Sequence, residues 1–247
     1  MDSNVLAGAQ LALPVQLPDH ARFDNFVIGA GNLGERQSQL IAHLERLSQE
    51  NVQSTLQYTA IFGERGRGKT HLLCALCERC AERGRTSIYL PLRDFVGTSA
   101  IDILQGLEHY DLIALDDVDS VSLDPKWAEA LFALFNRVQD RRSGFLVLSA
   151  QGTAASLPMA FEDLRSRLQW ATPFRLGAPT DSDKVKILRQ HAQVRGLELS
   201  EGVAEFMVQR MPRDLHELMN ALDRLDSASI EKQRRLTLPF VKEILAL

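Results

Sequence analysis

The chain has 247 residues, of which 45% are hydrophobic and 24% are charged, and its formal net charge is −4. These values are typical of a globular protein with one domain, or one domain plus a small second one, and the slight acidity argues against a surface that coats DNA by itself. The sequence contains no apolar run of about 18 residues, the length that a membrane-spanning helix needs, and no signal-peptide pattern, so we expect a cytoplasmic protein.

The first 21 residues predict a flexible tail, because they lack a helical period and contain prolines. Within this tail, Leu11 and Leu13 alternate as they would in an extended strand, and Pro14 prevents a helix. An extended segment with Gln10 and two apolar anchors can insert into a groove on a partner protein. The alternative is a tail whose leucines have no partner, since short motifs often occur by chance.

The folded part is predicted to start with residues 23–29, which read FDNFVIG, and to continue in a helix over residues 34–50. Leu40, Leu44 and Leu47 would share one face of this helix. Short runs rich in β-branched and aromatic residues then predict strands. These strands cover residues 58–62, 87–90, 111–117, 145–149 and 172–176.

Helical patterns separate the predicted strands. The clearest begins where Asp124 can cap a helix and Pro125 can occupy its first position, and it ends before Gly144. Strands and helices that alternate in this way indicate a parallel sheet with right-handed connections. The predicted fold class is therefore α/β, with helices on both faces of the sheet.

The chain is organised around residues 63–70, which read GERGRGKT and match the G-x-x-x-x-G-K-T phosphate-binding loop. Its glycines allow a tight turn whose N–H groups point inward, while the lysine can reach the β- and γ-phosphates and the threonine a Mg²⁺ ion. A predicted strand precedes the loop and a predicted helix follows it, which favours phosphate binding over an ordinary glycine-rich turn. The candidate nucleotide-binding residues here are Gly63, Gly66, Arg67, Gly68, Lys69, Thr70 and His71.

The strand predicted over residues 111–117 ends in two carboxylates, Asp116 and Asp117, in the Walker B form. Such a strand end can hold the hydration shell of Mg²⁺ beside the phosphates. We therefore predict that Thr70 and Asp116 bind Mg²⁺ and that Asp117 is a catalytic candidate. A strand that ends in Asp also occurs as a simple turn signal, but its position after the phosphate loop favours the site.

Three cysteines follow His71 at steps of three residues, as Cys74, Cys77 and Cys80. Steps of three on a helix of 3.6 residues per turn drift by about 60° each, so four such side chains spread over half the circumference and cannot surround one ion. We predict small buried side chains in a reducing compartment.

After Pro179 the pattern is entirely helical, and Leu215, Leu218, Leu222 and Leu225 form the clearest stripe. The predicted helices cover residues 180–195, 200–211, 213–235 and 239–246. The sequence thus predicts a tail over residues 1–21, an α/β nucleotide-binding domain over residues 22–177 and a helical domain over residues 178–247.

A phosphate-loop α/β domain followed by a small helical lid resembles the AAA+ superfamily, and within it the replication initiator DnaA. Residues 23–32, 68–73, 115–117 and 164–170 are similar to successive DnaA motifs. The resemblance spans roughly residues 22–226, and it implies a three-layer AAA+ domain followed by an all-α lid domain.

Two differences from DnaA indicate a narrower family within this resemblance. DnaA begins with a self-association domain and ends in a DNA-binding helix-turn-helix domain, whereas this sequence carries a short tail whose Gln10, Leu11, Leu13 and Pro14 resemble the bacterial sliding-clamp-binding motif. That arrangement is similar to the Hda family, DnaA homologues that act with the loaded clamp to make DnaA hydrolyse its ATP. Residues 234–241 are similar to that family too.

The resemblance also implies roles for single residues. Arg167 matches an arginine finger that acts in trans, with Arg165 as the second candidate, and Ile28 lies in the segment that precedes the nucleotide site. Gln151 stands where a sensor Asp is usual. His216 stands where a lid arginine usually reads the γ-phosphate, with Arg213 one turn earlier.

These replacements bear on the protein's own chemistry. A neutral histidine lacks the fixed charge and the planar guanidinium group through which arginine binds phosphate. We therefore expect at most weak hydrolysis of the protein's own ATP, and either ADP or ATP with Mg²⁺ as the bound cofactor.

The leading expectation is a negative regulator of replication initiation that binds the sliding clamp and DnaA, meets DNA only through the clamp, and makes no contact with membranes. Two alternatives stay open: a helicase loader or other replication-associated motor that uses its own ATP, and a small-molecule kinase with a phosphate loop. The second leaves the helical domain and residues 164–170 unexplained. A homo-oligomer is also an open alternative.

Overall fold

The structure is a computed structural model that describes residues 21–49, 56–212 and 214–247. The predicted clamp-binding motif at Gln10, Leu11, Leu13 and Pro14 lies outside these residues, as does Arg213. The helices and strands, in chain order, are α1 (Gly31–Gln49), β1 (Leu56–Phe62), α2 (Lys69–Glu82), β2 (Ser87–Pro91), β3 (Leu112–Asp116), α3 (Pro125–Arg141), β4 (Gly144–Ala150), α4 (Glu162–Leu168), β5 (Thr172–Arg175), α5 (Asp181–Val194), α6 (Glu201–Arg210), α7 (Leu215–Lys232) and α8 (Leu238–Leu245).

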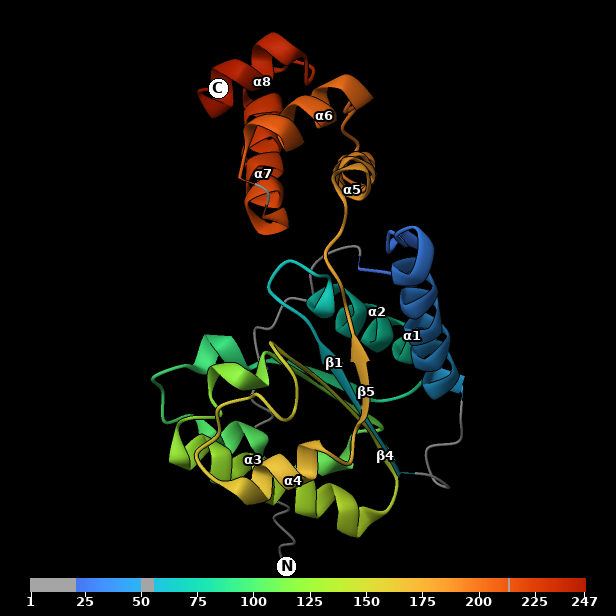
Figure 1. Ribbon diagram of the computed structural model, residues 1–247, viewed down its shortest axis with the longest axis vertical. Helices are drawn as coiled ribbons and strands as arrows, with labels where there is room; N and C mark the ends of the chain where they lie inside the picture. Colours follow the sequence, from blue (N-terminus) through green and yellow to red (C-terminus); the bar gives the residue numbers. More distant parts are fainter. Residues whose placement is uncertain (1–20, 50–55, 213) are drawn as a thin grey trace, which may run out of the picture.

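The described residues form one five-stranded sheet in which every pair of neighbouring strands is parallel. Its strand order is β2-β3-β4-β1-β5, so β1 lies between β4 and β5 rather than beside β2. Helices α1 and α2 pack on one face, while α3 and α4 pack on the other (Figure 1). This three-layer arrangement confirms the predicted parallel α/β fold.

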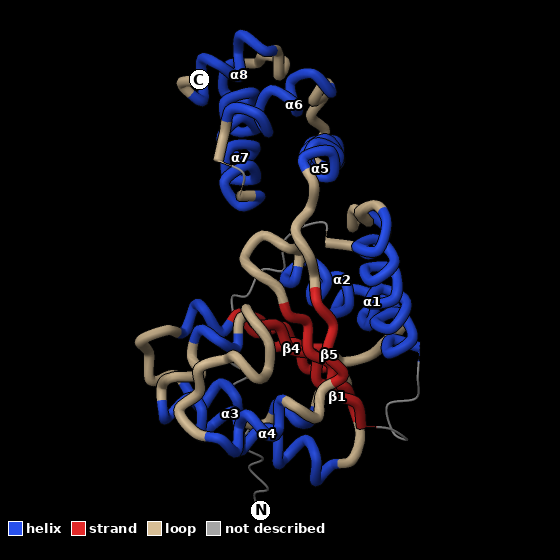
Figure 2. The backbone as a smooth tube through the Cα atoms, viewed as in Figure 1, coloured by secondary structure: helices blue, strands red, loops and turns tan. Residues whose placement is uncertain are grey.

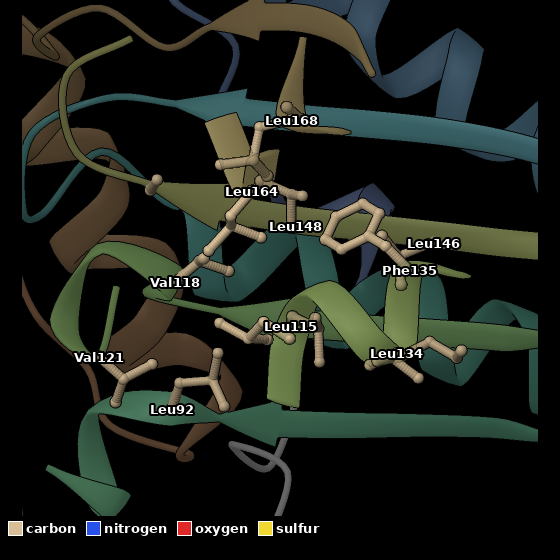
Figure 3. Packing of buried hydrophobic residues seen from close by; sticks show 14 of the residues in the cluster. Leu92, Leu115, Val118, Val121, Leu134, Phe135, Leu146, Leu148, Leu164 and Leu168 are labelled. Carbon is tan, nitrogen blue, oxygen red and sulfur yellow. The ribbon is translucent and has the colours of Figure 1, made fainter. Parts of the chain in front are cut away.

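Two hydrophobic clusters hold the layers together, one on each face of the sheet. On one face, α3 and α4 pack against β3 and β4 through side chains such as Phe135, Leu164 and Leu148 (Figure 3). On the other, α1 and α2 cover the sheet through a cluster that includes Leu44 and Leu76, both fully buried. Burial of this kind stabilises the fold by about 25 cal/mol for each Å² of apolar surface removed from water.

A third hydrophobic cluster lies in the C-terminal helices α5–α8, which extend beyond the sheet in Figures 1 and 2. Leu188, Met207, Leu222 and Phe240, one from each helix, are fully buried in it. A loop leads from β5 to these helices (Figure 2). A separate core supports the predicted second domain, whose boundary at residue 178 stays a prediction.

The ends of several elements differ from their predicted positions. Helix α1 begins at Gly31, three residues before the predicted start at residue 34. Helix α7 ends at Lys232 instead of residue 235, because Gln233 adopts a positive φ of 51°. Strand β3 ends at Asp116, since Asp117 also leaves extended geometry with a φ of 52°.

Helix α2 carries the three cysteines on its buried side. Cys74, Cys77 and Cys80 are all free thiols and all buried, as predicted. Burial is the main reason why the pKa of each thiol is raised, to about 12 for Cys77 and about 11 for Cys80. Within the described residues, no helix has both the length and the apolar character that crossing a membrane requires.

Candidate nucleotide-binding site

The phosphate loop connects β1 to α2 at the carboxyl ends of the strands. Gly66 and Gly68 adopt positive φ angles of 73° and 87°, a conformation that glycine takes without steric cost. A Cβ atom on Gly68 would lie only 2.7 Å from the ring of Phe26. The backbone shape of the loop and this close approach therefore both require glycine at position 68.

Lys69 lies at the start of α2 and is buried. Its Nζ donates hydrogen bonds to the carbonyl oxygens of Gly63, at 2.9 Å, and Glu64, at 3.1 Å. Burial lowers the pKa of Lys69, while Asp117 and Asp116 act in the opposite direction. The ammonium group thus lies inside the turn of the loop, facing the region where the two carboxylates are.

Asp116 is held by hydroxyl groups on both of its oxygens. Thr70 Oγ1 and Tyr89 Oη donate to Oδ2, at 2.6 and 2.9 Å, and Ser149 Oγ donates to Oδ1. Burial and the nearby carboxylate raise the pKa of Tyr89, which keeps its phenol protonated as a donor. The predicted pair Thr70 and Asp116 is brought together, and its oxygen ligands are those that Mg²⁺ prefers.

Asp117 turns away from β3 in a left-handed conformation. Its Oδ2 accepts a hydrogen bond from Arg93 Nε at 2.8 Å, and its backbone N donates to Ser149 Oγ at 2.9 Å. The hydrogen bond to Asp117 is the main reason why the pKa of Arg93 is raised. The second Walker B carboxylate is therefore ion-paired within its own chain.

A cavity of about 980 Å³ opens between the phosphate loop, the segment before α1 and the C-terminal helices. It brings together residues that lie far apart in the sequence. Its lining includes Phe26, Val27, Lys69, Asp116, His191 and His216. A volume of this size falls at the upper end of the range for small-molecule and cofactor sites.

His71 forms part of the cavity wall beside the phosphate loop. Its Nε2 lies 2.8 Å from the carbonyl oxygen of Arg22, and its ring makes edge contacts with Phe26 and His191 at centroid distances of 5.5 and 6.2 Å. Burial lowers the pKa of His71, which favours the neutral imidazole. These aromatic and neutral surfaces suit a planar organic ring.

Three of the predicted nucleotide-binding residues, Gly63, Ile28 and Gln151, fall outside the set of described residues that line this cavity. Ile28 is 45% exposed, whereas its neighbour Val27 lines the cavity. Gln151 follows β4 and donates its backbone N–H to Asp119 Oδ1 at 3.0 Å. Sequence reasoning missed Tyr89, Arg93, Phe26, His191 and Ser149, which come from separate elements and share no motif with the phosphate loop.

The start of helix α7 lies directly against the phosphate loop. Arg65 Nη2 is 3.1 Å from His216 Nε2, which joins the loop to the helix. A Cβ atom on Gly66 would lie 3.1 Å from Asp214 Oδ1, and that carboxylate caps α7 by accepting from the backbone N–H of His216 at 2.8 Å. The structure thus places His216 at the cavity, in contact with an arginine of the loop.

Arg167 occupies a different part of the molecule. Its guanidinium stacks on Trp170, 4.2 Å from the ring centroid, and lies 5.4 Å from the Phe132 centroid. Its Nη1 donates to Gln139 Oε1 at 2.9 Å. Burial raises the pKa of Tyr58 at the start of β1, and the positive charge of Arg167 acts against that rise.

The position of Arg167 follows from the chain topology. Helix α4 ends immediately before β5 begins, so Arg167 lies near the amino ends of the parallel strands, while Lys69 and Asp116 lie at their carboxyl ends. Figure 1 shows α4 at the opposite end of the molecule from α7. Arg165, on the same helix, donates to Glu162 Oε2 at 3.0 Å and to the carbonyl oxygen of Ala155 at 2.8 Å.

Comparison with protein families gives two matches that together cover most of the chain. The model described as the bacterial DnaA ATPase domain matches residues 17–174, and the model described as the Hda lid domain matches residues 181–245. A Haemophilus influenzae protein described as uncharacterized is 39% identical over 238 residues, which span 96% of this chain and 99% of that protein.

Solved structures show the same fold. Domain III of the Thermotoga maritima replication initiation protein DnaA superposes with a TM-score of 0.76 at 21% identity, covering 94% of this chain and 98% of that one. AMPPCP-bound DnaA from Aquifex aeolicus gives a TM-score of 0.63 at 21% identity, over 84% of this chain and 65% of that one. The Thermotoga maritima RuvB Holliday junction branch migration motor gives 0.62 at 19% identity, over 94% and 73%.

Proposed function

This chain belongs to the DnaA-related AAA+ family and carries the lid domain of its Hda members, and from that premise we propose that it is a nucleotide-bound regulator that inactivates DnaA. In this proposal it binds the DNA-loaded sliding clamp, contacts ATP-bound DnaA and promotes hydrolysis of that ATP. The observation that carries the proposal is the combination of a DnaA-type ATPase domain with an Hda lid in one chain.

Nucleotide binding is assigned to the cavity at the phosphate loop. Lys69 and the loop N–H groups would meet the phosphates, and the aromatic wall near His71 would face the base. Thr70 and Asp116 would hold Mg²⁺, which when bound neutralises charge on the phosphate oxygens. The similarity of the fold to AMPPCP-bound DnaA supports an adenine nucleotide.

The location of Arg167 supports an action in trans. Because it lies near the amino ends of the strands, away from its own phosphate loop, its guanidinium is available to the ATP site of a second molecule rather than to its own. Stacking on Trp170 and the hydrogen bond to Gln139 hold the group in one orientation. A preorganised cation stabilises charge on a transferring phosphoryl group without reorganisation in the transition state.

The test is the rate at which ATP bound to DnaA becomes ADP, measured with radiolabelled ATP in the presence of DNA-loaded clamp. We expect the wild-type chain to stimulate this rate and Arg167→Ala to abolish the stimulation, since such fingers change rates by about 10³–10⁵ in GTPases. Arg167→Lys should rescue little, because lysine lacks the planar fork.

A matched control keeps this test specific. Arg189 lies on α5 and pairs with Glu201 at 3.2 Å, so Arg189→Ala should keep full stimulation. Nucleotide titrations should be the same for all variants, and melting curves should show that each variant is folded. Full stimulation by Arg167→Ala would remove this residue from the mechanism and leave Arg165 or a purely conformational effect.

A motor that uses its own ATP is the second candidate, favoured by the intact contact between Thr70 and Asp116. The ion pair of Asp117 with Arg93 argues against it, because the carboxylate is already engaged. Multiple-turnover ATP hydrolysis by the chain alone, without DnaA or clamp, separates the two. Fast turnover that Arg167→Ala leaves unchanged would favour the motor.

A further inference from the structure

The contact between Arg65 and His216 joins two parts of the molecule that are 151 positions apart in the sequence. Arg65 belongs to the phosphate loop, and His216 belongs to the first turn of α7 in the C-terminal helices. Their side-chain nitrogens are 3.1 Å apart, and both residues line the 980 Å³ cavity. The two elements also touch where Gly66 meets Asp214, so the contact is not an isolated approach of two long side chains.

The chemistry of this pair fixes the role of each partner. A guanidinium only donates hydrogen bonds, so His216 Nε2 must accept one, and the imidazole is then neutral at that nitrogen. The histidine therefore adds no charge of its own to the cavity. His216 restricts the orientation of the flexible Arg65 side chain, which keeps its positive charge and can still donate hydrogen bonds from its other N–H groups.

The other cations of the loop have different partners. Arg67 donates to Glu64 Oε2 at 2.6 Å, and Lys69 donates to two loop carbonyl oxygens. Arg65 is instead directed to the C-terminal helices at the rim of the cavity. The planar guanidinium group of Arg65 matches the geometry of a phosphate group, because two of its N–H groups can bind two phosphate oxygens at once.

We propose that Arg65 binds the phosphate chain of the nucleotide and that His216 is the positioning residue that orients its guanidinium. The pair then links phosphate binding to the packing of α7 on the loop, and Arg65 places a guanidinium beside His216. This inference rests on the proposed nucleotide site and adds a specific phosphate-binding residue to it.

The experiment is a calorimetric titration of the full-length chain with ADP and Mg²⁺. Arg65→Ala should weaken binding about tenfold, the loss of one charge-assisted contact, and Arg65→Lys should recover little of it. His216→Ala should weaken binding several-fold. In the double variant Arg65→Ala/His216→Ala, the loss should equal that of Arg65→Ala alone, because the histidine acts only through the arginine.

Two further variants separate positioning from a general structural effect. His216→Gln offers an amide oxygen that can accept from the guanidinium, so it should restore most of the affinity lost in His216→Ala. Arg189→Ala, an arginine on α5 paired with Glu201, should bind ADP as the wild type does. All variants should melt at the same temperature without nucleotide, since both side chains are exposed.

The outcomes distinguish this inference from the proposed function. Binding by Arg65→Ala within twofold of the wild type would overturn the phosphate role. Additive losses in the double variant, or no rescue by His216→Gln, would overturn the positioning role. If Lys69→Ala also left the affinity unchanged, the nucleotide site itself would be wrong; if Lys69→Ala alone weakened binding, only the Arg65 and His216 inference would fail.

Discussion

At the scale of single residues, the site depends on how a few charges are oriented by neutral groups. Asp116 is surrounded by the hydroxyls of Thr70, Tyr89 and Ser149, so its carboxylate has a defined orientation. Hydrogen bonds to a charged group contribute about 1.5–3 kcal/mol each, more than bonds between neutral groups. Lys69, the cation opposite, donates to two backbone carbonyl oxygens.

Lys69→Ala should weaken binding of adenine nucleotides tenfold or more, which corresponds to at least about 1.4 kcal/mol for a lost charge-assisted contact. The reason is that Lys69 is the buried cation of the loop and faces the two Walker B carboxylates. Calorimetric titration with ADP and with ATP measures the effect, and Asp116→Ala provides a comparison that should reduce mainly the Mg²⁺-dependent part. Unchanged affinity would contradict the assignment of the loop.

The site residues that the sequence predicts are those whose expected chemistry depends on local spacing. The glycines, Lys69 and Thr70 lie within one loop, and the strand that ends in Asp116 is short and apolar, so their patterns are local. Tyr89, Ser149 and Arg93 could not be predicted, because nothing near them in the sequence indicates that the ends of β2 and β4 converge on the two carboxylates that follow β3.

At the scale of elements, helix α2 starts in the candidate nucleotide-binding site, and its later turns are buried against the sheet. It begins at Lys69 and carries Cys74, Cys77 and Cys80 against the sheet. The helices were predictable because apolar periodicity reports which face is buried, and the strands because they are short runs rich in β-branched and aromatic residues. The sequence led to no prediction for residues 92–109, where the structure has short 3-10 turns whose few residues carry no periodic signal.

The buried thiols of α2 should resist alkylation in the folded protein. Their raised pKa values, about 12 for Cys77 and about 11 for Cys80, leave little reactive thiolate at pH 8. We expect slow reaction with iodoacetamide, followed by mass spectrometry, and rapid reaction once urea unfolds the chain. Fast labelling of Cys77 in the native protein would contradict the packing of α2.

The same shifts make stability depend on pH. A thiol with a pKa raised by folding stabilises the native state below its unfolded pKa, ordinarily 9.0, and this contribution is lost as the pH rises toward the folded value. The urea midpoint should therefore fall between about pH 9 and pH 11. Replacing Cys77 by Ala should make the urea midpoint fall less steeply with pH than it does in the wild type, although some packing is lost.

The surface formed by α3 and α4 offers a second test at this scale. Trp170 is 51% exposed and stacks on the Arg167 guanidinium, a contact worth about 0.5–1 kcal/mol at an exposed site. Trp170→Ala should therefore reduce stimulation of DnaA by about two- to fivefold through poorer orientation of Arg167. Trp170→Phe should retain part of the effect.

The matched control for Trp170 is Ile230, a large apolar side chain on α7 that is 73% exposed. Ile230→Ala should leave the stimulation of DnaA unchanged. If both alanine variants lost activity equally, the effect would come from a general change in surface properties, and the orientation of Arg167 by Trp170 would be rejected.

At the scale of the whole molecule, the candidate nucleotide site and the predicted arginine finger are separated in space. The cavity lies between the phosphate loop and the C-terminal helices. Helix α4, which carries Arg167, lies near the amino ends of the strands, away from these helices (Figure 1). A nucleotide bound in the cavity would contact both hydrophobic units, since Lys69 comes from one and His216 from the other.

Binding to the sliding clamp is predicted to reside in residues 1–20, separate from the remainder of the chain, to which we assign the stimulation of ATP hydrolysis. Deleting residues 1–20 should abolish binding to the sliding clamp, since Gln10, Leu11 and Leu13 supply the predicted groove contacts. The melting temperature should change little, because the sequence of this segment predicts a tail rather than part of a core. Surface plasmon resonance with immobilised clamp measures the binding.

A point variant makes this test more specific than the deletion. Gln10→Ala combined with Leu13→Ala should reduce clamp affinity as strongly as the deletion does, whereas Asp2→Ala should have no effect, because it lies outside the motif. Both variants should bind ADP normally, since the cavity is lined by residues from Ala21 onward among those described. If the truncated chain still binds the clamp with unchanged affinity, residues 1–20 do not recruit it, and the clamp contact must lie on the folded part of the molecule.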